Sequence, residues 1–276
     1  MDDGRLNSRP IGVFDSGLGG LTTVRELCRL LPEEDIVYFG DTGRVPYGTR
    51  SAETIFRYAA QDVRFLLGHE LKCIVVACGT VSSVALPRLL EMTDIPILGV
   101  IEPAVRAAVR ATKNGRIGVV GTSATIRSGT YREGLLAANP GLEIISKPCP
   151  LLVPLVEDGR FSEGCTVTEL LVEEYVSPLL KQNIDTLILG CTHYPLLTGI
   201  FSKLCGPDVA LINPGYEAVS ALRELLSEND ALRGGGPACG EHYYVSDSEQ
   251  QFLQYAEMFL RGPVHGQVQR IDIENY

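Results

Sequence analysis

Short apolar runs alternate with amphipathic segments along the first hundred or so residues. The runs IGVFDSG, DIVYFGDTG, CIVVACG and IPILGVIEP are rich in β-branched and aromatic residues and are bounded by glycine, proline or polar residues, as buried strands usually are. Between them, LTTVRELCRLLP and TIFRYAAQDVRFLLGHE repeat apolar side chains at helical spacing. This alternation predicts an α/β fold built from βαβ units, with a parallel sheet and helices on both of its faces.

The same layout restarts near residue 101. Residues 102–115 predict a helix that stops at Asn-Gly, and RIGVVGTSAT then repeats the strand and polar loop of IGVFDSG. DTLILGCTHYP similarly repeats CIVVACGT. A strand with a polar loop, followed by a strand that ends in Cys-Thr or Cys-Gly-Thr, therefore occurs twice, about a hundred residues apart, which predicts two similar α/β halves that face each other. Two further strand–helix units follow residue 207, and their sequence does not indicate which half each one joins.

Composition narrows the class of protein. A chain of 276 residues is long enough for one large domain or two ordinary ones. The net charge is −10, and there is no cluster of lysines and arginines, which argues against nucleic acid as the main partner. No apolar run approaches the roughly 20 residues that span a bilayer, and MDDGRLNSRP lacks the apolar core of a signal peptide. We therefore expect a cytoplasmic protein without membrane association, whose eight cysteines are reduced thiols.

The residues that follow each predicted strand are small, polar or reactive. Ligands of parallel α/β sheets bind beyond the carboxyl ends of the strands, where backbone amides and hydroxyl groups are available. These groups suit a small anionic substrate. DSGLGG lacks both the lysine of a phosphate-binding loop and the G-x-G-x-x-G spacing, which disfavours a nucleotide site. The strand ends in question are Asp15-Ser16-Gly17, Asp41-Thr42-Gly43, Cys78-Gly79-Thr80, Gly121-Thr122-Ser123 and Cys191-Thr192-His193.

Two cysteines stand out by their position. Cys78 and Cys191 each end an apolar strand just before a predicted helix, where the helix dipole and free amides lower the pKa of a thiol. His193 is a candidate acid/base group, and Asp15 could orient a substrate ammonium or a thiol, or simply cap the next helix. The other six cysteines are expected to be small core residues. The absence of C-x-x-C spacing disfavours zinc and a redox pair.

One thiol from each of two facing halves suits a particular reaction. A racemase or epimerase removes a proton from one face of a carbon and delivers another proton to the opposite face. One base then starts as a thiolate and the other as a thiol, and their roles exchange with the direction of the reaction. We therefore predict racemisation or epimerisation.

Four motifs support this reading: FDSGLGGLTTVREL, DTGRVPYGTRS, VVACGT and LGCTHYPLL, in this order. Together they resemble the cofactor-independent glutamate racemases of the aspartate/glutamate racemase family over essentially the whole chain. The resemblance implies two pseudo-symmetric α/β domains, residues 1–100 plus 208–276 and residues 101–207, with the active site in the cleft between them. It further implies conversion of L-glutamate to D-glutamate for peptidoglycan without cofactor or metal. A homodimer is expected.

The resemblance also assigns roles to individual residues. Cys78 would be the base for the D enantiomer, assisted by Asp15, and Cys191 the base for the L enantiomer, assisted by His193. The residues expected to contact glutamate are Asp15, Ser16, Tyr47, Gly48, Gly79, Thr80, Thr122, Glu157, Thr192 and His193.

One position departs from the family pattern. Gly79 stands where the family usually has an asparagine that contacts substrate, so one polar contact is missing. A lost charge-assisted hydrogen bond costs roughly 1.5 to 3 kcal/mol, and on that basis Gly79→Asn should tighten glutamate binding. Two alternatives stay open at this point: a racemase of a related amino acid such as aspartate, and a non-catalytic amino-acid-binding protein on the same fold.

Overall fold

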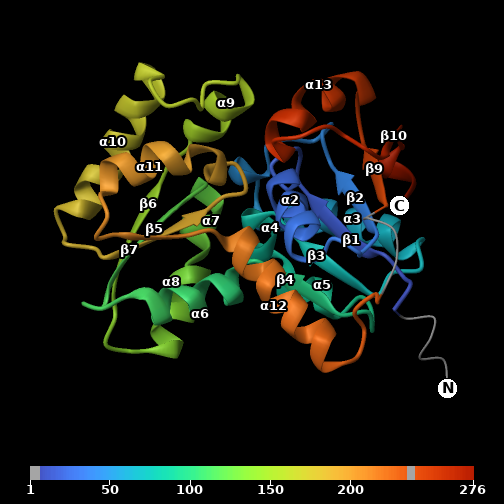
Figure 1. The fold of residues 1–276 in the computed structure, drawn as a ribbon, viewed down its shortest axis with the longest axis horizontal. Coiled ribbons are helices and arrows are strands. Elements are labelled where there is room, and N and C mark those ends of the chain that lie inside the picture. The colour runs from blue at the N-terminus through green and yellow to red at the C-terminus, as the bar shows by residue number, and fades with distance from the viewer. Residues whose placement is uncertain (1–6, 235–239) are drawn as a thin grey trace.

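The computed structural model describes residues 7–234 and 240–276, which form two parallel sheets, one in each half of the molecule (Figure 1). Every hydrogen-bonded pair of strands is parallel, as predicted. The first sheet has the order β10-β9-β2-β1-β3-β4, with β1 (Ile11–Asp15), β2 (Ile36–Gly40), β3 (Cys73–Val76), β4 (Ile97–Gly99), β9 (Glu241–Val245) and β10 (Gln267–Arg270). The second has the order β6-β5-β7-β8, with β5 (Arg116–Gly121), β6 (Glu143–Pro148), β7 (Thr186–Gly190) and β8 (Ala210–Ile212).

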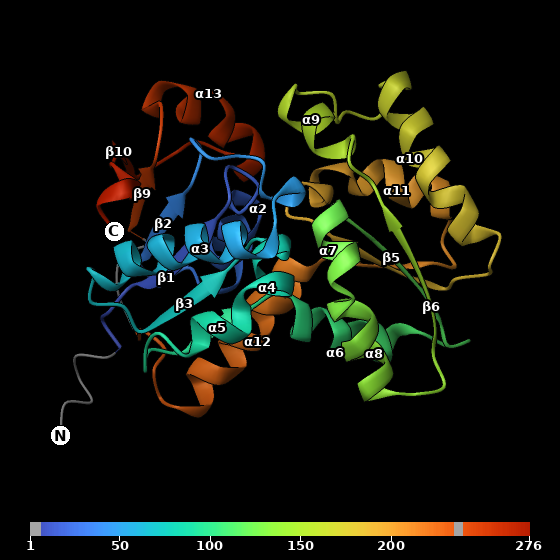
Figure 2. The ribbon, with the colours of Figure 1, turned by 180° about the vertical axis from the view of Figure 1, so that it is seen from behind.

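Helices lie around both sheets (Figures 1 and 2). Strands β1, β2, β3 and β7 are buried along their whole length, which explains why they are continuous apolar runs rather than alternating ones. The first half contains α2 (Leu21–Leu30), η1 (Tyr47–Thr49), α3 (Ala52–Leu67), α4 (Gly79–Val84), α5 (Leu86–Leu90), α13 (Glu249–Leu260) and η3 (Ile273–Asn275). The second contains α6 (Ile101–Ala111), α7 (Ser123–Ser128), α8 (Thr130–Ala138), α9 (Leu152–Glu157), α10 (Thr166–Leu180), η2 (Tyr194–Leu197) and α11 (Thr198–Cys205).

The segment after residue 207 is divided between the halves. Strand β8 pairs with β7 in the second sheet, whereas β9 pairs with β2 in the first. Between them, α12 (Pro214–Glu228) runs along the boundary and packs against α2 of one half and α6 of the other (Figure 1). The expectation that residues 208–276 all belong to the first half is therefore wrong for β8, because backbone pairing with β7 rather than chain position decides which sheet it joins.

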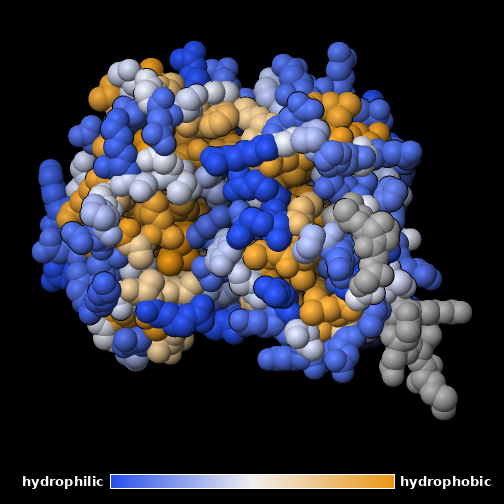
Figure 3. All heavy atoms as spheres, in the orientation of Figure 1, coloured by the Kyte–Doolittle hydropathy of each residue, from blue (hydrophilic) through white to orange (hydrophobic). Residues whose placement is uncertain are grey.

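The pattern of apolar residues does not predict β6 or α10. Strand β6 lies at the edge of its sheet, and exposed side chains are mixed with partly and fully buried ones along it, so it lacks the continuous apolar run of the central strands. Among the helices that the structure describes, none is long and apolar enough to cross a membrane. Hydrophilic residues line much of the boundary between the halves on the face shown in Figure 3, with hydrophobic residues visible on both sides.

Candidate active site

A cavity of about 340 Å³ lies between the two halves, at the carboxyl ends of their central strands. This is where ligands bind in open parallel sheets, and the volume suits a small amino acid. All the site residues predicted from the sequence line this cavity except Asp15, which lies behind its wall. The predicted residues in the lining are Ser16, Tyr47, Gly48, Cys78, Gly79, Thr80, Thr122, Glu157, Cys191, Thr192 and His193.

Cys78 is the N-cap residue of α4, as the sequence predicted, but its thiol is not activated there. The side chain is buried, and its Sγ lies 3.3 Å from the Ser16 hydroxyl oxygen. Burial raises the pKa of Cys78 to about 12, and Asp15 adds to this by repulsion of a thiolate. The expectation that the helix start lowers this pKa is wrong because desolvation outweighs the dipole of a helix of only six residues. Cys78 is therefore a protonated thiol at neutral pH.

Cys191 has a different electrostatic environment. Its Sγ lies 3.8 Å from Nδ1 of His193, whose Nε2 lies 3.0 Å from Oε1 of Glu157. Burial alone would lower the pKa of His193, but the contacts with Cys191 and Glu157 raise it to about 10. The ring also packs edge-on against Phe259 of α13. A charged imidazolium is therefore held 3.8 Å from the sulfur of Cys191.

Asp15 ends β1 and is completely buried. Its Oδ2 accepts a hydrogen bond from the backbone amide of Gly17 at 3.0 Å, and its Oδ1 lies 3.5 Å from the hydroxyl oxygen of Thr192. Burial raises the pKa of Asp15, while the charge of His193 opposes the shift. Asp15 therefore supports the loops that carry Ser16 and Thr192 from behind the cavity wall.

Hydroxyl groups connect the two halves at the cavity. The Thr80 and Thr122 hydroxyl oxygens are 3.0 Å apart, and the Thr22 hydroxyl donates to the backbone carbonyl of Thr192 at 2.9 Å. The first pair lies in the cavity lining and offers two hydroxyl groups from opposite sides to a bound carboxylate.

Gly79 lies where the backbones of the two halves approach each other closely. A Cβ atom at this position would lie 2.8 Å from the carbonyl oxygen of Gly190, at the end of β7. Real Cβ atoms essentially never come this close to a backbone oxygen, so any larger residue requires the backbone to move. The structure therefore argues against the expectation that Gly79→Asn tightens glutamate binding.

One further cysteine, expected to be a small core residue, lies in the cavity lining. Cys149 follows β6 and lines the cavity although its side chain is buried. Burial raises its pKa to about 12, so it is an unreactive thiol at neutral pH. KPCP ends a strand on cysteine just as the other two motifs do, and the same rule would have found it had β6 been identified.

The remaining cysteines differ in their burial. Cys73 is buried, as expected of a core residue, whereas Cys28, Cys165 and Cys205 are only partly buried, and Cys239 lies outside the described residues. In residues 7–234 and 240–276, no group of three or more histidine, cysteine or acidic side chains is arranged to hold a metal ion.

Comparisons with known proteins give a consistent result. The Asp/Glu/Hydantoin racemase family matches residues 16–222. The chain is 42% identical to a glutamate racemase of Geobacter metallireducens over 96% of its own length and 97% of that protein. It is 44% identical to a glutamate racemase of Streptococcus pneumoniae over 94% of its length and 98% of that protein. The crystal structure of glutamate racemase from Francisella tularensis with D-glutamate superposes with a TM-score of 0.90 at 40% identity, covering 98% of this chain and 100% of that one.

Proposed function

The chain belongs to the Asp/Glu/hydantoin racemase family, and we propose that it is a glutamate racemase that uses Cys78 and Cys191 as its two bases. The observation that carries this assignment is the position of these thiols, one from each half, in the lining of one cavity. The D-glutamate formed would supply peptidoglycan synthesis. Glutamate as the substrate is supported by the curated relatives and by the Francisella structure, whose ligand is D-glutamate.

The two thiols have different surroundings. Cys78, with its raised pKa, is protonated, while the imidazolium of His193 lies 3.8 Å from the sulfur of Cys191. For L-glutamate, Cys191 as a thiolate removes the α-proton from one face, and Cys78 delivers its proton to the other. This leaves a thiol at Cys191 and a thiolate at Cys78, which is the starting state for D-glutamate.

The negative charge that develops at the α-carbon spreads onto the substrate carboxylate. Hydroxyl groups of Ser16, Thr80, Thr122 and Thr192 line the cavity and can donate hydrogen bonds to it. Glu157, which we expected to contact glutamate, lies on the far side of the His193 ring from Cys191. Its charge supports the protonated ring, so we assign it an indirect role in the chemistry.

Exchange of the substrate α-proton with deuterated water tests this mechanism. Cys78→Ala should abolish racemisation but still exchange the α-proton of L-glutamate, because Cys191 can return a deuteron to the same face. Cys191→Ala should exchange only D-glutamate. Cys205→Ala is the control, because this partly buried cysteine does not line the cavity. Wild-type racemisation in either cavity variant would refute the two-thiol mechanism, and preference for aspartate would refute the substrate assignment.

Two expectations stay predictions. Sedimentation of the purified protein would test the homodimer. Fractionation of the producing cells would test the cytoplasmic location.

A further inference from the structure

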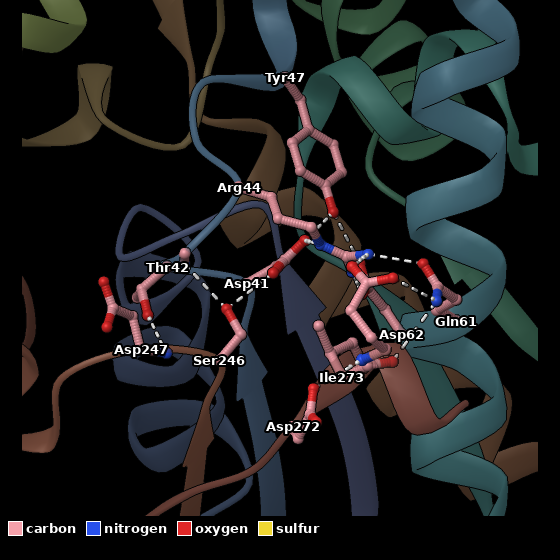
Figure 4. A network of polar contacts seen from close by, with 12 residues as sticks. Asp41, Thr42, Arg44, Tyr47, Gln61, Asp62, Ser246, Asp247, Asp272 and Ile273 are labelled. Atoms are coloured by element: carbon pink, nitrogen blue, oxygen red, sulfur yellow. Dashed lines mark hydrogen bonds and ion pairs between the residues drawn. The ribbon is translucent and has the colours of Figure 1, made fainter.

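A buried polar cluster lies beside the substrate cavity, where the chain leaves β2 and forms η1 (Figure 4). It contains Asp41, Arg44, Tyr47 and Asp62, and both carboxylates are completely buried. The Arg44 guanidinium donates to Asp41 at 2.7 Å and to Asp62 at 3.1 Å. The cluster therefore places two carboxyl groups against one buried cation.

The hydroxyl of Tyr47 lies between the two carboxyl groups. Its oxygen makes a short hydrogen bond to Oδ2 of Asp41 and lies 3.2 Å from Oδ2 of Asp62. A phenol has one proton to donate, and the shorter contact assigns it to Asp41. The contact with Asp62 then has no proton unless the carboxyl group of Asp62 supplies one. The number of available protons thus favours a series of two hydrogen bonds, in which Asp62 donates to Tyr47 and Tyr47 donates to Asp41.

The surroundings of Asp62 agree with a neutral acid. The groups that face it are Asp41 and Arg44 from the loop after β2, Tyr47 from η1 and Asp15 from β1. Burial and repulsion by Asp41 raise the pKa of Asp62 well above its ordinary value, and the attraction of Arg44 does not compensate. Asp41 also accepts a hydrogen bond from the Ser246 hydroxyl at 2.7 Å, so donors reach both of its oxygens.

The cluster also ties the C-terminal turn to the site. Arg44 contacts Gln61 of α3 and Glu274 of η3, and its guanidinium lies 4.2 Å above the ring of Tyr58. Since Arg44 also donates to Asp41 and Asp62, its donor groups are engaged on several sides. The loop that precedes η1 is therefore fixed by contacts with two separate elements, α3 and η3.

The position of Tyr47 matters for the cavity. Tyr47 and Gly48 both line it, and a Cβ atom on Gly48 would lie 2.9 Å from Cβ of Thr122 in the other half. The Tyr47 side chain thus extends from the cavity wall into the polar cluster. A shift of Tyr47 would move the Gly48 backbone relative to Thr122, a predicted substrate contact.

We propose that Asp62 is a positioning residue, held as a neutral carboxylic acid that donates to the Tyr47 hydroxyl and so fixes the Tyr47–Gly48 wall of the substrate cavity. Only the expected effect of Asp62 on catalysis rests on the proposed racemase function. The protonation state itself is a property of the folded protein and can be measured without substrate.

Reversible unfolding as a function of pH tests the protonation state. Asp62→Asn keeps a neutral side chain that can donate to Tyr47, whereas wild type must release a proton from Asp62 when it unfolds above pH 4, because a free aspartate has a pKa of about 3.9. Between pH 5 and the pKa of folded Asp62, the ratio of the unfolding equilibrium constant of wild type to that of Asp62→Asn should therefore rise about tenfold for each pH unit. Glu53→Gln is the matched control, an exposed carboxylate on the same helix.

Steady-state kinetics test the positioning role. Asp62→Asn should keep KM for both enantiomers within about threefold of wild type, and Asp62→Ala should raise KM about tenfold or more, with a smaller change in kcat. Equal pH dependence of unfolding in wild type and Asp62→Asn, or failure of Asp62→Asn to fold, would overturn the proposal. So would a wild-type KM in Asp62→Ala.

The two measurements separate this proposal from the proposed function. A protein that racemises no amino acid but shows the predicted pH difference refutes the racemase assignment and supports the neutral Asp62. If Asp62→Ala fails to fold, the comparison of wild type with Asp62→Asn still decides the question.

Discussion

Replacement of Gly79 tests how closely the two halves must approach. The Cβ of Gly79→Asn would lie 2.8 Å from the Gly190 carbonyl oxygen, while ordinary contact begins near 3.4 Å. The backbone at this point must therefore open by about 0.6 Å, the difference between these distances. The atom that blocks the new side chain belongs to the end of β7, which is held in register by pairing with β5 and cannot move as a flexible side chain would.

The loss of stability can be worked out from the contacts that this opening of the backbone disturbs. Two hydrogen bonds cross the same boundary, Thr22 to the Thr192 carbonyl at 2.9 Å and Thr80 to Thr122 at 3.0 Å. An opening of this size would bring both to the limit of hydrogen bonding, and each is worth about 1 kcal/mol. Overpacking of a tight contact itself costs about 1 to 3 kcal/mol. We expect the free energy of unfolding to fall by about 3 to 5 kcal/mol and kcat/KM for glutamate to fall about tenfold.

Gly79→Ala and Gly79→Asn should be measured together by denaturant unfolding and by kinetics with both glutamate enantiomers. The alanine variant isolates the effect of the Cβ atom, and the asparagine variant adds the amide. Gly262→Ala is the matched control, because nothing lies within 4 Å of its added Cβ. Unchanged stability and kinetics in Gly79→Ala would refute the steric argument. Tighter glutamate binding by Gly79→Asn would instead favour the expectation drawn from the family pattern.

Three further predictions concern charge. His193 has a folded-state pKa of about 10 against an ordinary value of 6.5, so its stabilising contribution is complete below pH 6.5 and is lost as the pH rises towards 10. The melting temperature of wild type should therefore fall over this pH range, and His193→Gln should lack this fall. Glu157→Gln removes the charge that supports this ring and should lower the rate of α-proton exchange from L-glutamate by about tenfold, whereas an unchanged rate would exclude the role assigned to Glu157. Lys72→Met leaves the buried carboxylate of Glu34 without the ammonium 2.6 Å away and should lower the free energy of unfolding by about 3 to 5 kcal/mol, measured by urea titration; a loss below 1 kcal/mol would contradict this.

The fold class and the two thiols were accessible from sequence because their signals are local. Buried parallel strands are continuous apolar runs, and a strand that ends on Cys78 or Cys191 places that residue at the binding edge of its sheet. The edge strand β6 gave a weaker signal because only part of it is buried. The prediction that Cys149 is a buried core residue is confirmed, but its place in the cavity lining was missed together with β6.

Sheet membership, charge states and steric room depend on residues far apart in the chain, so only the tertiary structure decided them. Backbone pairing placed β8 in the second sheet, desolvation kept the Cys78 thiol protonated against the effect of its helix, and the Gly190 carbonyl took the space beside Gly79. The cluster around Asp62 likewise forms only when α3, η1 and the C-terminal turn meet. The sequence by itself thus determined which groups reach the site, because strand and turn patterns are local. Only the fold decided their charge states and the room around them, since burial and close approach arise from distant segments packing together.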